Sequence, residues 1–127
     1  MSASNLLLQM MYDSRDTTQL TINDSRMKEH LENIDKAFEN SIRLGIMAVL
    51  MVNRSMDFNS LKKMLGTTDG NLSSNLSYLL DQKYITVKKQ FINNKPNTSY
   101  SAMEAGRRAF KVHIDAMEKI ISHGKRK

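Results

Sequence analysis

Hydrophobic residues recur at helical spacing over residues 68–82. Leu72, Leu76, Leu79 and Leu80 fall on one stripe of an α-helix. At about 100° per residue, the opposite face carries short polar side chains and no lysine or arginine. The members of that face are Gly70, Asn71, Ser74, Ser77, Tyr78 and Asp81. Serine and asparagine donate and accept hydrogen bonds, so this face fits either a polar surface helix or a helix that reads base edges in a DNA major groove.

A shorter helix is predicted directly before it, over residues 57–66. Asp57 is its expected N-cap, Gly66 its C-terminal stop, and Thr68 the expected N-cap of the helix that follows. Its apolar side consists of Phe58, Leu61, Met64 and Leu65. Two short helices joined by a tight glycine turn are typical of a helix-turn-helix, whose second helix enters a DNA groove.

Two helices are predicted upstream. The first spans about residues 26–39, and the second begins after Asn40 and Ser41 and is apolar almost all round, which indicates a central place in the core. Gly45 within the second helix predicts close approach by another helix. Residues 1–25 are expected to form a flexible or partly helical N-terminal tail.

A β-hairpin is predicted downstream. Residues 84–92 are rich in β-branched and aromatic side chains, residues 93–96 form a turn, and residues 97–100 a second short strand. Ser101 and Glu104 have the spacing of a capping box, which predicts a last helix from residue 101 to about residue 122. This order predicts an α+β fold that is mainly helical, with a helix-turn-helix and a two-stranded hairpin.

The last helix has an apolar side close to heptad spacing, which favours pairing with a second copy of the chain. The residues predicted at that dimer interface are Phe110, His113, Met117, Ile120 and Ile121. Packing of this side along its own domain is the alternative. A dimer interface on the first helix, through Met27, Leu31 and Ile34, is a further alternative.

The charge of the chain is unevenly distributed. The 127 residues carry 19 basic and 13 acidic side chains, a net charge of +6. Residues 83–127 hold 11 of the basic and 3 of the acidic side chains. A basic C-terminal part indicates an anionic partner, of which nucleic acid is the commonest and a membrane surface the next. With no apolar run of membrane-spanning length and no signal-peptide pattern, the protein is expected in the cytoplasm.

Catalytic and metal-binding patterns are missing from the sequence. There is no cysteine, which excludes disulfides and thiolate chemistry, and the three histidines lie on separate segments without metal-ligand spacing. Ser73 and Ser74 have no nearby base, and residues 66–70 lack the lysine of a phosphate-binding loop. The sequence therefore predicts no enzyme, no cofactor and no metal. A small-molecule effector is compatible with it but not indicated by it.

Four segments together resemble the small bacterial winged-helix regulators of the MarR-like and ArsR-like kind. They are residues 41–47, 68–76, 95–100 and 104–110, and the resemblance extends over about residues 30–121. The chain departs from the family pattern at three positions. Lys83 stands where glycine is usual, Asn97 where a basic residue often follows the wing proline, and Asn75 where histidine is common.

The resemblance implies a homodimer that binds pseudo-palindromic operator DNA. From the residues we predict a winged-helix domain over residues 26–127, whose last helix, about residues 101–122, forms the dimer. The resemblance puts recognition contacts on Asn71, Ser73, Ser74 and Asn75, and wing contacts around Asn94 and Lys95. To these we add Ser77 and Tyr78 on the recognition helix, and Lys62, Lys63, Lys88 and Lys89 as phosphate contacts. The alternative function is a winged-helix module that binds a protein and no DNA.

Overall fold

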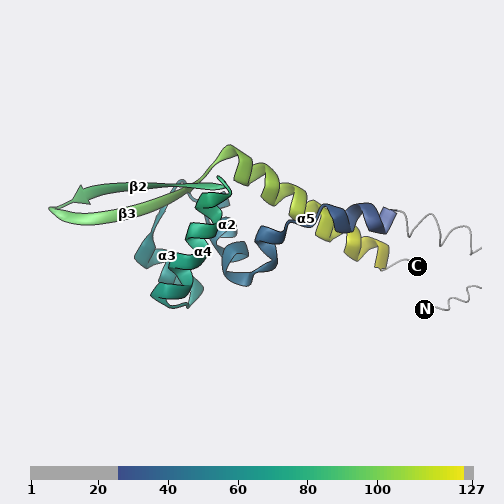
Figure 1. Ribbon diagram of the computed structural model, residues 1–127, viewed down its shortest axis with the longest axis horizontal. Helices are drawn as coiled ribbons and strands as arrows, with labels where there is room; N and C mark the ends of the chain where they lie inside the picture. The colour runs from purple at the N-terminus through teal and green to yellow at the C-terminus, as the bar shows by residue number, and fades with distance from the viewer. Residues whose placement is uncertain (1–25, 125–127) are drawn as a thin grey trace, which may run out of the picture. The chain divides into compact units, whose positions relative to one another are not determined.

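The computed structural model describes residues 26–124 (Figure 1). The predictions for residues 1–25 and for the basic tail at 125–127 lie outside the described residues. The described chain falls into two compact units, Ile34–Ile114 and a second unit that holds residues 26–33 and 115–124. The predicted helix-turn-helix and the hairpin both belong to the Ile34–Ile114 unit.

The elements follow one another in the predicted order. A helix over residues 26–32 comes first. It is followed by η1 (Lys36–Glu39), α2 (Ser41–Val52), β1 (Met56–Asp57), α3 (Phe58–Leu65), α4 (Asp69–Asp81), β2 (Ile85–Ile92), β3 (Lys95–Ala102) and α5 (Glu104–Gly124). Helices with one small antiparallel sheet confirm the predicted fold class.

The core of the Ile34–Ile114 unit is built around α2, which packs against η1, α3, α4 and β3. Its largest fully buried side chains are Ile46, Met47, Leu50, Leu61, Leu72, Leu76, Leu79 and Ile85. A Cβ atom added to Gly45 would lie 2.7 Å from Cδ2 of Leu65 on α3. This contact confirms that the glycine in α2 admits a neighbouring helix at close range.

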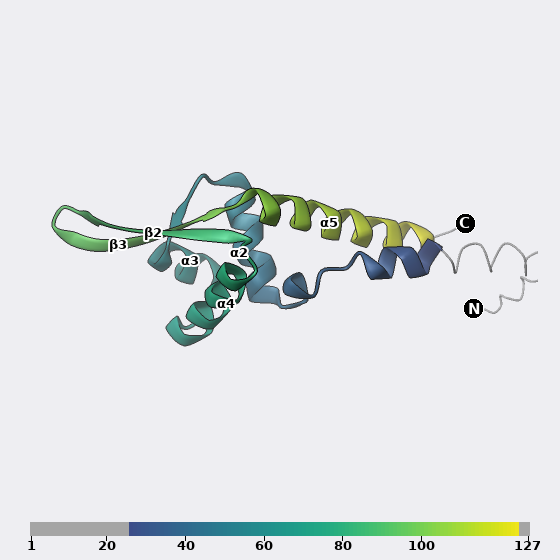
Figure 2. The same ribbon diagram turned by 45° about the horizontal axis from the view of Figure 1, so that its top comes forward.

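The sheet has the strand order β1-β3-β2 and is antiparallel throughout. Asn93 and Asn94 join β2 to β3 with φ angles of 53° and 63°, the left-handed conformation that a two-residue type I′ turn requires. Asparagine tolerates this conformation better than most residues. Both views show the β2–β3 hairpin projecting away from α2, α3 and α4 (Figures 1 and 2).

The predicted helix ends of the helix-turn-helix are confirmed. The carboxylate of Asp57 accepts from the backbone N–H of Ser60, and the hydroxyl of Thr68 accepts from that of Asn71. Gly66 terminates α3 with a φ of 60°, and its backbone N–H reaches the carbonyls of Lys62 and Lys63. These caps hold α3 and α4 in a fixed tight turn.

Two local predictions were wrong, and one strand was not predicted. The helix predicted over residues 26–39 is interrupted, because Asp35 is extended and its side chain accepts from Ala37 N–H, which begins η1 instead. Ser101 does not cap the last helix, since it pairs with Thr86 in a strand that runs to Ala102. The two-residue strand β1 was not predicted, because its only partners lie on β3, far away in the sequence.

The end of α4 is a Schellman motif with an unusual residue in it. The N–H of Tyr84 donates to the carbonyl of Leu79, and that of Lys83 to the carbonyl of Leu80. Lys83 therefore occupies the left-handed position, with a φ of 64°. A side chain is strained there, which explains why glycine is the usual residue at this point.

No helix within residues 26–124 is long and apolar enough to cross a membrane.

Gly106 on α5 generates a stability prediction. A Cβ atom there would lie 2.2 Å from the backbone oxygen of Tyr84, an atom that also accepts from Met103 N–H. We expect Gly106→Ala to lower the free energy of unfolding by about 3 kcal/mol or more, because backbone cannot move aside as a side chain can. Urea denaturation followed by circular dichroism measures this change.

Gly70→Ala is the matched control, because a Cβ at Gly70 meets nothing within 4 Å. In the first turn of α4 that change should be neutral or stabilising by up to about 1 kcal/mol. Equal stability of the two variants would contradict the close contact between α5 and Tyr84.

Candidate nucleic-acid interface

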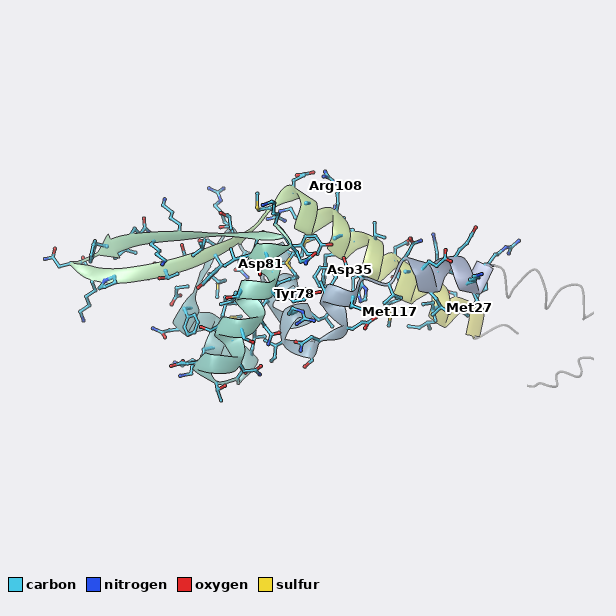
Figure 3. The ribbon with its side chains drawn as sticks, viewed as in Figure 1. Met27, Asp35, Tyr78, Asp81, Arg108 and Met117 are labelled. Carbon is cyan, nitrogen blue, oxygen red and sulfur yellow. The ribbon has the colours of Figure 1, made fainter. Side chains whose placement is uncertain are left out.

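The outward face of α4 is polar and uncharged apart from Asp81 near its end. Asn71, Ser73, Ser74 and Ser77 are exposed, while Leu72, Leu76 and Leu79 are buried against the core. Tyr78 is half-buried and Asp81 exposed on the same helix (Figure 3). The helical period therefore predicted correctly which side of α4 faces outward. The outward face of α4 offers hydrogen-bond donors and acceptors on short side chains, which suits base edges.

Asn75 does not belong to this face. Its side chain is only 5% exposed. Its amide N–H groups donate to the backbone carbonyl and the side-chain oxygen of Asn71, at 2.9 and 3.1 Å. The prediction that Asn75 contacts DNA is corrected, because the residue lies within the buried arc of α4 and its hydrogen bonds are used inside the protein.

Arg43 on α2 holds Asn75 in place. Its guanidinium donates to Oδ1 of Asn75 at 2.9 Å and to the carbonyl of Ala37 at 2.7 Å. The same guanidinium lies over the ring of Tyr78, 3.9 Å from the centroid. Arg43 thus satisfies two acceptors and supports an aromatic ring by a cation–π contact.

Asn71 is oriented from two sides. Its Nδ2 donates to Oγ1 of Thr67 at 2.8 Å, while its Oδ1 accepts from Asn75. An asparagine amide has two N–H donors and two acceptor lone pairs, so each end of the Asn71 amide keeps half its capacity. A bidentate contact with a base needs one donor and one acceptor, and both remain free on this fixed amide.

The hairpin lysines are divided between the two faces of the sheet. Opposed residues of an antiparallel pair point the same way, and successive residues point opposite ways. Lys89, opposite Thr98, therefore shares its face with the buried Tyr100 opposite Val87. Lys88 and Lys95 point to the other face. All three are exposed, as is Asn94 at the turn.

An open hollow of about 400 Å³ lies between the start of α3, Ser73 of α4 and the hairpin. It is lined by Asp57, Phe58, Asn59, Ser73, Lys89, Pro96, Asn97, Thr98 and Tyr100. The Ser60 hydroxyl, at 2.6 Å, lowers the pKa of Asp57, which caps α3 from this hollow. Ser73 and Lys89 thus face one shared space, which links the helix face to one face of the hairpin.

The lysines of α3 have different surroundings. Lys62 pairs with Asp69 in the first turn of α4, with Nζ 2.9 Å from Oδ1. Lys63 is exposed. Because the Lys62–Asp69 pair is itself exposed, it is weak enough to open for a phosphate.

One of the residues predicted at the dimer interface is buried within the fold of its own chain. His113 is 5% exposed, its Nδ1 accepts from the backbone N–H of Asp35 at 3.0 Å, and its ring packs edge-on against Phe38. The carboxylate of Asp35 accepts in turn from the hydroxyl of Tyr84 at 2.8 Å. Burial, and then the hydrogen bond to Asp35, raise the pKa of Tyr84 to about 12. His113 is therefore removed from the predicted dimer surface.

Comparison with known proteins places this geometry in a family. The model of the winged helix DNA-binding domain matches residues 42–121. The chain belongs to the winged helix DNA-binding domain family. In winged-helix terms α3 and α4 form the helix-turn-helix, α4 is the recognition helix, and the β2–β3 hairpin is the wing.

Individual relatives agree with this assignment. An uncharacterized protein of Methanocaldococcus jannaschii is 35% identical over 79 residues, which is 62% of this chain and 86% of that protein. A transcriptional regulator homologue from Pyrococcus horikoshii is 28% identical, with a TM-score of 0.70 over 77% of this chain and 99% of that one. AbfR, solved in its reduced form bound to DNA, has the same fold, with 14% identity and a TM-score of 0.57 over 94% and 83% of the two chains.

The protein is thus a DNA-binding winged-helix regulator, the kind of protein that its sequence resembles. The family is one of DNA-binding proteins and not of enzymes. Two residues that support the recognition helix, Arg43 and Thr67, were not predicted as part of the site. The signal for Arg43 was present, since it is a single charge in an otherwise apolar helix.

The Arg43 contacts generate a prediction. We expect Arg43→Met to lower the free energy of unfolding by about 2–4 kcal/mol, because it leaves the buried Asn75 oxygen and the Ala37 carbonyl without a donor. Thermal and urea unfolding measure the loss.

Arg108→Met provides the control on α5. Arg108 makes one exposed ion pair with Glu104, so its replacement should change stability by no more than about 0.5 kcal/mol. If the two variants lost equal stability, Arg43 would not be the support of α4 that its contacts indicate.

Proposed function

We propose that this protein binds duplex DNA sequence-specifically as a homodimer, with α4 in the major groove and the wing on the flanking backbone or minor groove. The observation that carries the proposal is the outward face of α4. It presents hydrogen-bonding side chains on a helix whose orientation is fixed by buried leucines and by Arg43. A surface helix without this task has no need of an oriented, uncharged polar face.

Contacts to bases and to phosphates fall to different elements in this proposal. Asn71, Ser74 and Ser77 on α4 meet base edges, with Ser73 and Tyr78 beside them. Lys89 and the other wing lysines, together with Lys63 on α3, neutralise phosphates. The first group contributes sequence discrimination and the second contributes affinity for any duplex.

Two variants separate these contributions. Operator sequences are first selected from a random duplex pool, and binding is then measured by fluorescence anisotropy at several salt concentrations. Lys89→Ala should weaken binding to all duplexes alike and reduce the slope of log K against log salt by about one unit. Ser74→Ala should instead weaken binding to the selected site by about 1–3 kcal/mol, with little effect on random duplex or on the salt slope.

The alternative function, a winged-helix module that binds only protein, makes the opposite prediction. Wild-type protein that fails to bind any duplex at low salt would overturn our proposal in favour of that module. Loss of the selected-site preference on Lys89→Ala, without change on Ser74→Ala, would show that α4 is not the reading helix.

The dimer is proposed to form through α5. Ile114, Met117 and Ile121 are exposed on this helix and follow one another at three and four residues, so they share one stripe. Phe110 continues the stripe towards the start of α5 but is half-buried, with its ring edge-on to Phe38. Ile120, predicted in the same interface, is also partly covered. An exposed apolar stripe of this kind is typical of a helix that pairs with a second copy.

Met117→Glu tests this interface. Met117 is 41% exposed, and a carboxylate at its place would be buried without a partner in the dimer. We expect a shift towards monomer in sedimentation velocity. The affinity for a two-half-site operator should fall by more than the loss of one contact explains, since each half then binds alone.

Val112→Glu is the matched control. Val112 is 49% exposed on the same helix, but five residues from Met117 it points roughly 140° away. That variant should remain dimeric. A Met117→Glu protein that stays dimeric would refute the α5 interface, and dissociation by Leu31→Glu would then assign it to the helix at residues 26–32, where Leu31 is exposed.

A further inference from the structure

The tip of the wing exposes an aromatic side chain that the proposed contacts do not use. Phe91 is 75% exposed near the end of β2, and Pro96, opposite it on β3, is also exposed. Single exposed apolar residues are common on protein surfaces. This one is different in its place, because it stands at the end of a hairpin that projects from the helices of its unit (Figure 2).

The strand register assigns Phe91 to a definite face of the wing. The pairs Val87–Tyr100, Lys89–Thr98 and Phe91–Pro96 succeed one another two residues apart, so their side chains all point the same way. That face starts at the buried Tyr100 and continues through Lys89 and Thr98, which line the hollow shared with Ser73 of α4. Phe91 is the outermost side chain on the wing face that borders the recognition helix.

The positive charge of the hairpin indicates an anionic partner for the exposed ring of Phe91. Residues 84–103 include three lysines, Lys88, Lys89 and Lys95, but no acidic residue. An apolar protein surface covering Phe91 would have to desolvate Lys89, which lies on the same face of the wing, without pairing its charge, and this is costly. The minor groove of DNA lies between two rows of phosphates, and a partly unstacked base step in it exposes apolar base faces, so it matches both the ring and the charges.

The tip is also preorganised. β2 and β3 pair over their full eight-residue lengths, and the type I′ turn closes them with two residues. The ring is therefore held out on paired strands and not on a loose loop. An apolar side chain that enters a base stack must be held in this way, since ordering a loop would add to the cost of unstacking.

We propose that Phe91, backed by Pro96, is an apolar wedge that enters the minor groove beside each half-site and partly unstacks one base step. This inference rests on the proposed function, since it requires α4 to lie in the adjacent major groove. Lys89, on the same face, contacts the phosphate next to the wedge. Partial unstacking kinks the duplex and is easiest at pyrimidine–purine steps such as TA. The wing thereby reads sequence through deformability.

The chain has no tryptophan, so one introduced at the tip is a clean reporter. Phe91→Trp and the matched control Ile92→Trp place it on opposite faces of β2. On addition of the selected duplex, emission from the Phe91→Trp protein should be quenched by stacking on bases. Emission from the Ile92→Trp protein should change little. Quenching that is equal for the two, or absent from the first, would refute the wedge.

Phe91→Ala tests the consequence for DNA. End-to-end energy transfer across a labelled duplex should show a bend with wild-type protein and with Ile92→Ala, and a much smaller bend with Phe91→Ala. Preference for a TA step over a stiff A-tract at the flank should fall from roughly tenfold to near equality. The unfolding midpoint should stay unchanged, because the ring makes little contact within the chain.

The outcomes separate this inference from the proposed function. If wild-type protein binds the selected duplex and responds to Ser74→Ala, but bends DNA equally with and without the Phe91 ring, the wedge alone is wrong. If wild-type protein binds no duplex at low salt, the proposed function fails and the wedge fails with it.

Discussion

The burial of one leucine stripe is the constraint on which the rest of this structure depends. Leu72, Leu76 and Leu79 are at most 2% exposed, and they fix α4 against α2. Because the side chains of a helix are rigidly phased, burying this stripe also determines which residues face outward. The burial of the leucines is therefore enough to turn the polar face of α4 outward. Arg43 then adds the buried polar contacts that hold the orientation of Asn71.

The periodicity of the sequence and the family resemblance each predicted part of this face. Asn75 lies three residues beyond Leu72 and one before Leu76, within the arc that the leucines bury. The helical period alone leaves Asn75 off the outward face, as it also leaves the exposed Ser73, and the resemblance placed both among the DNA contacts. A polar residue inside a buried arc needs partners, and Arg43 supplies one across the α2–α4 contact. No local pattern could reveal that pairing, because the two residues are far apart in the sequence.

Local signals predicted the caps and the turns, but they failed where a distant partner decides the conformation. Asp57, Gly66 and Thr68 act on neighbours within a few residues, so their roles were readable from the sequence. Ser101 had the spacing of a cap, yet pairing with Thr86 keeps it in a strand. The competition between a cap and a strand is resolved by tertiary context. Likewise, only packing can hold Lys83 in a conformation that favours glycine.

The charge distribution favours the proposed dimer over a single copy of this domain. The outward face of α4 lacks cations, so the contacts that we propose for it discriminate between sequences but add little long-range attraction. Attraction must come from the wing lysines, and only Lys89 of these points towards α4. A DNA-binding domain with this charge distribution gains affinity most efficiently by dimerisation, because a second copy adds contacts to DNA without weakening the discrimination between sequences. The exposed apolar stripe on α5 is the surface through which we propose that the second copy binds.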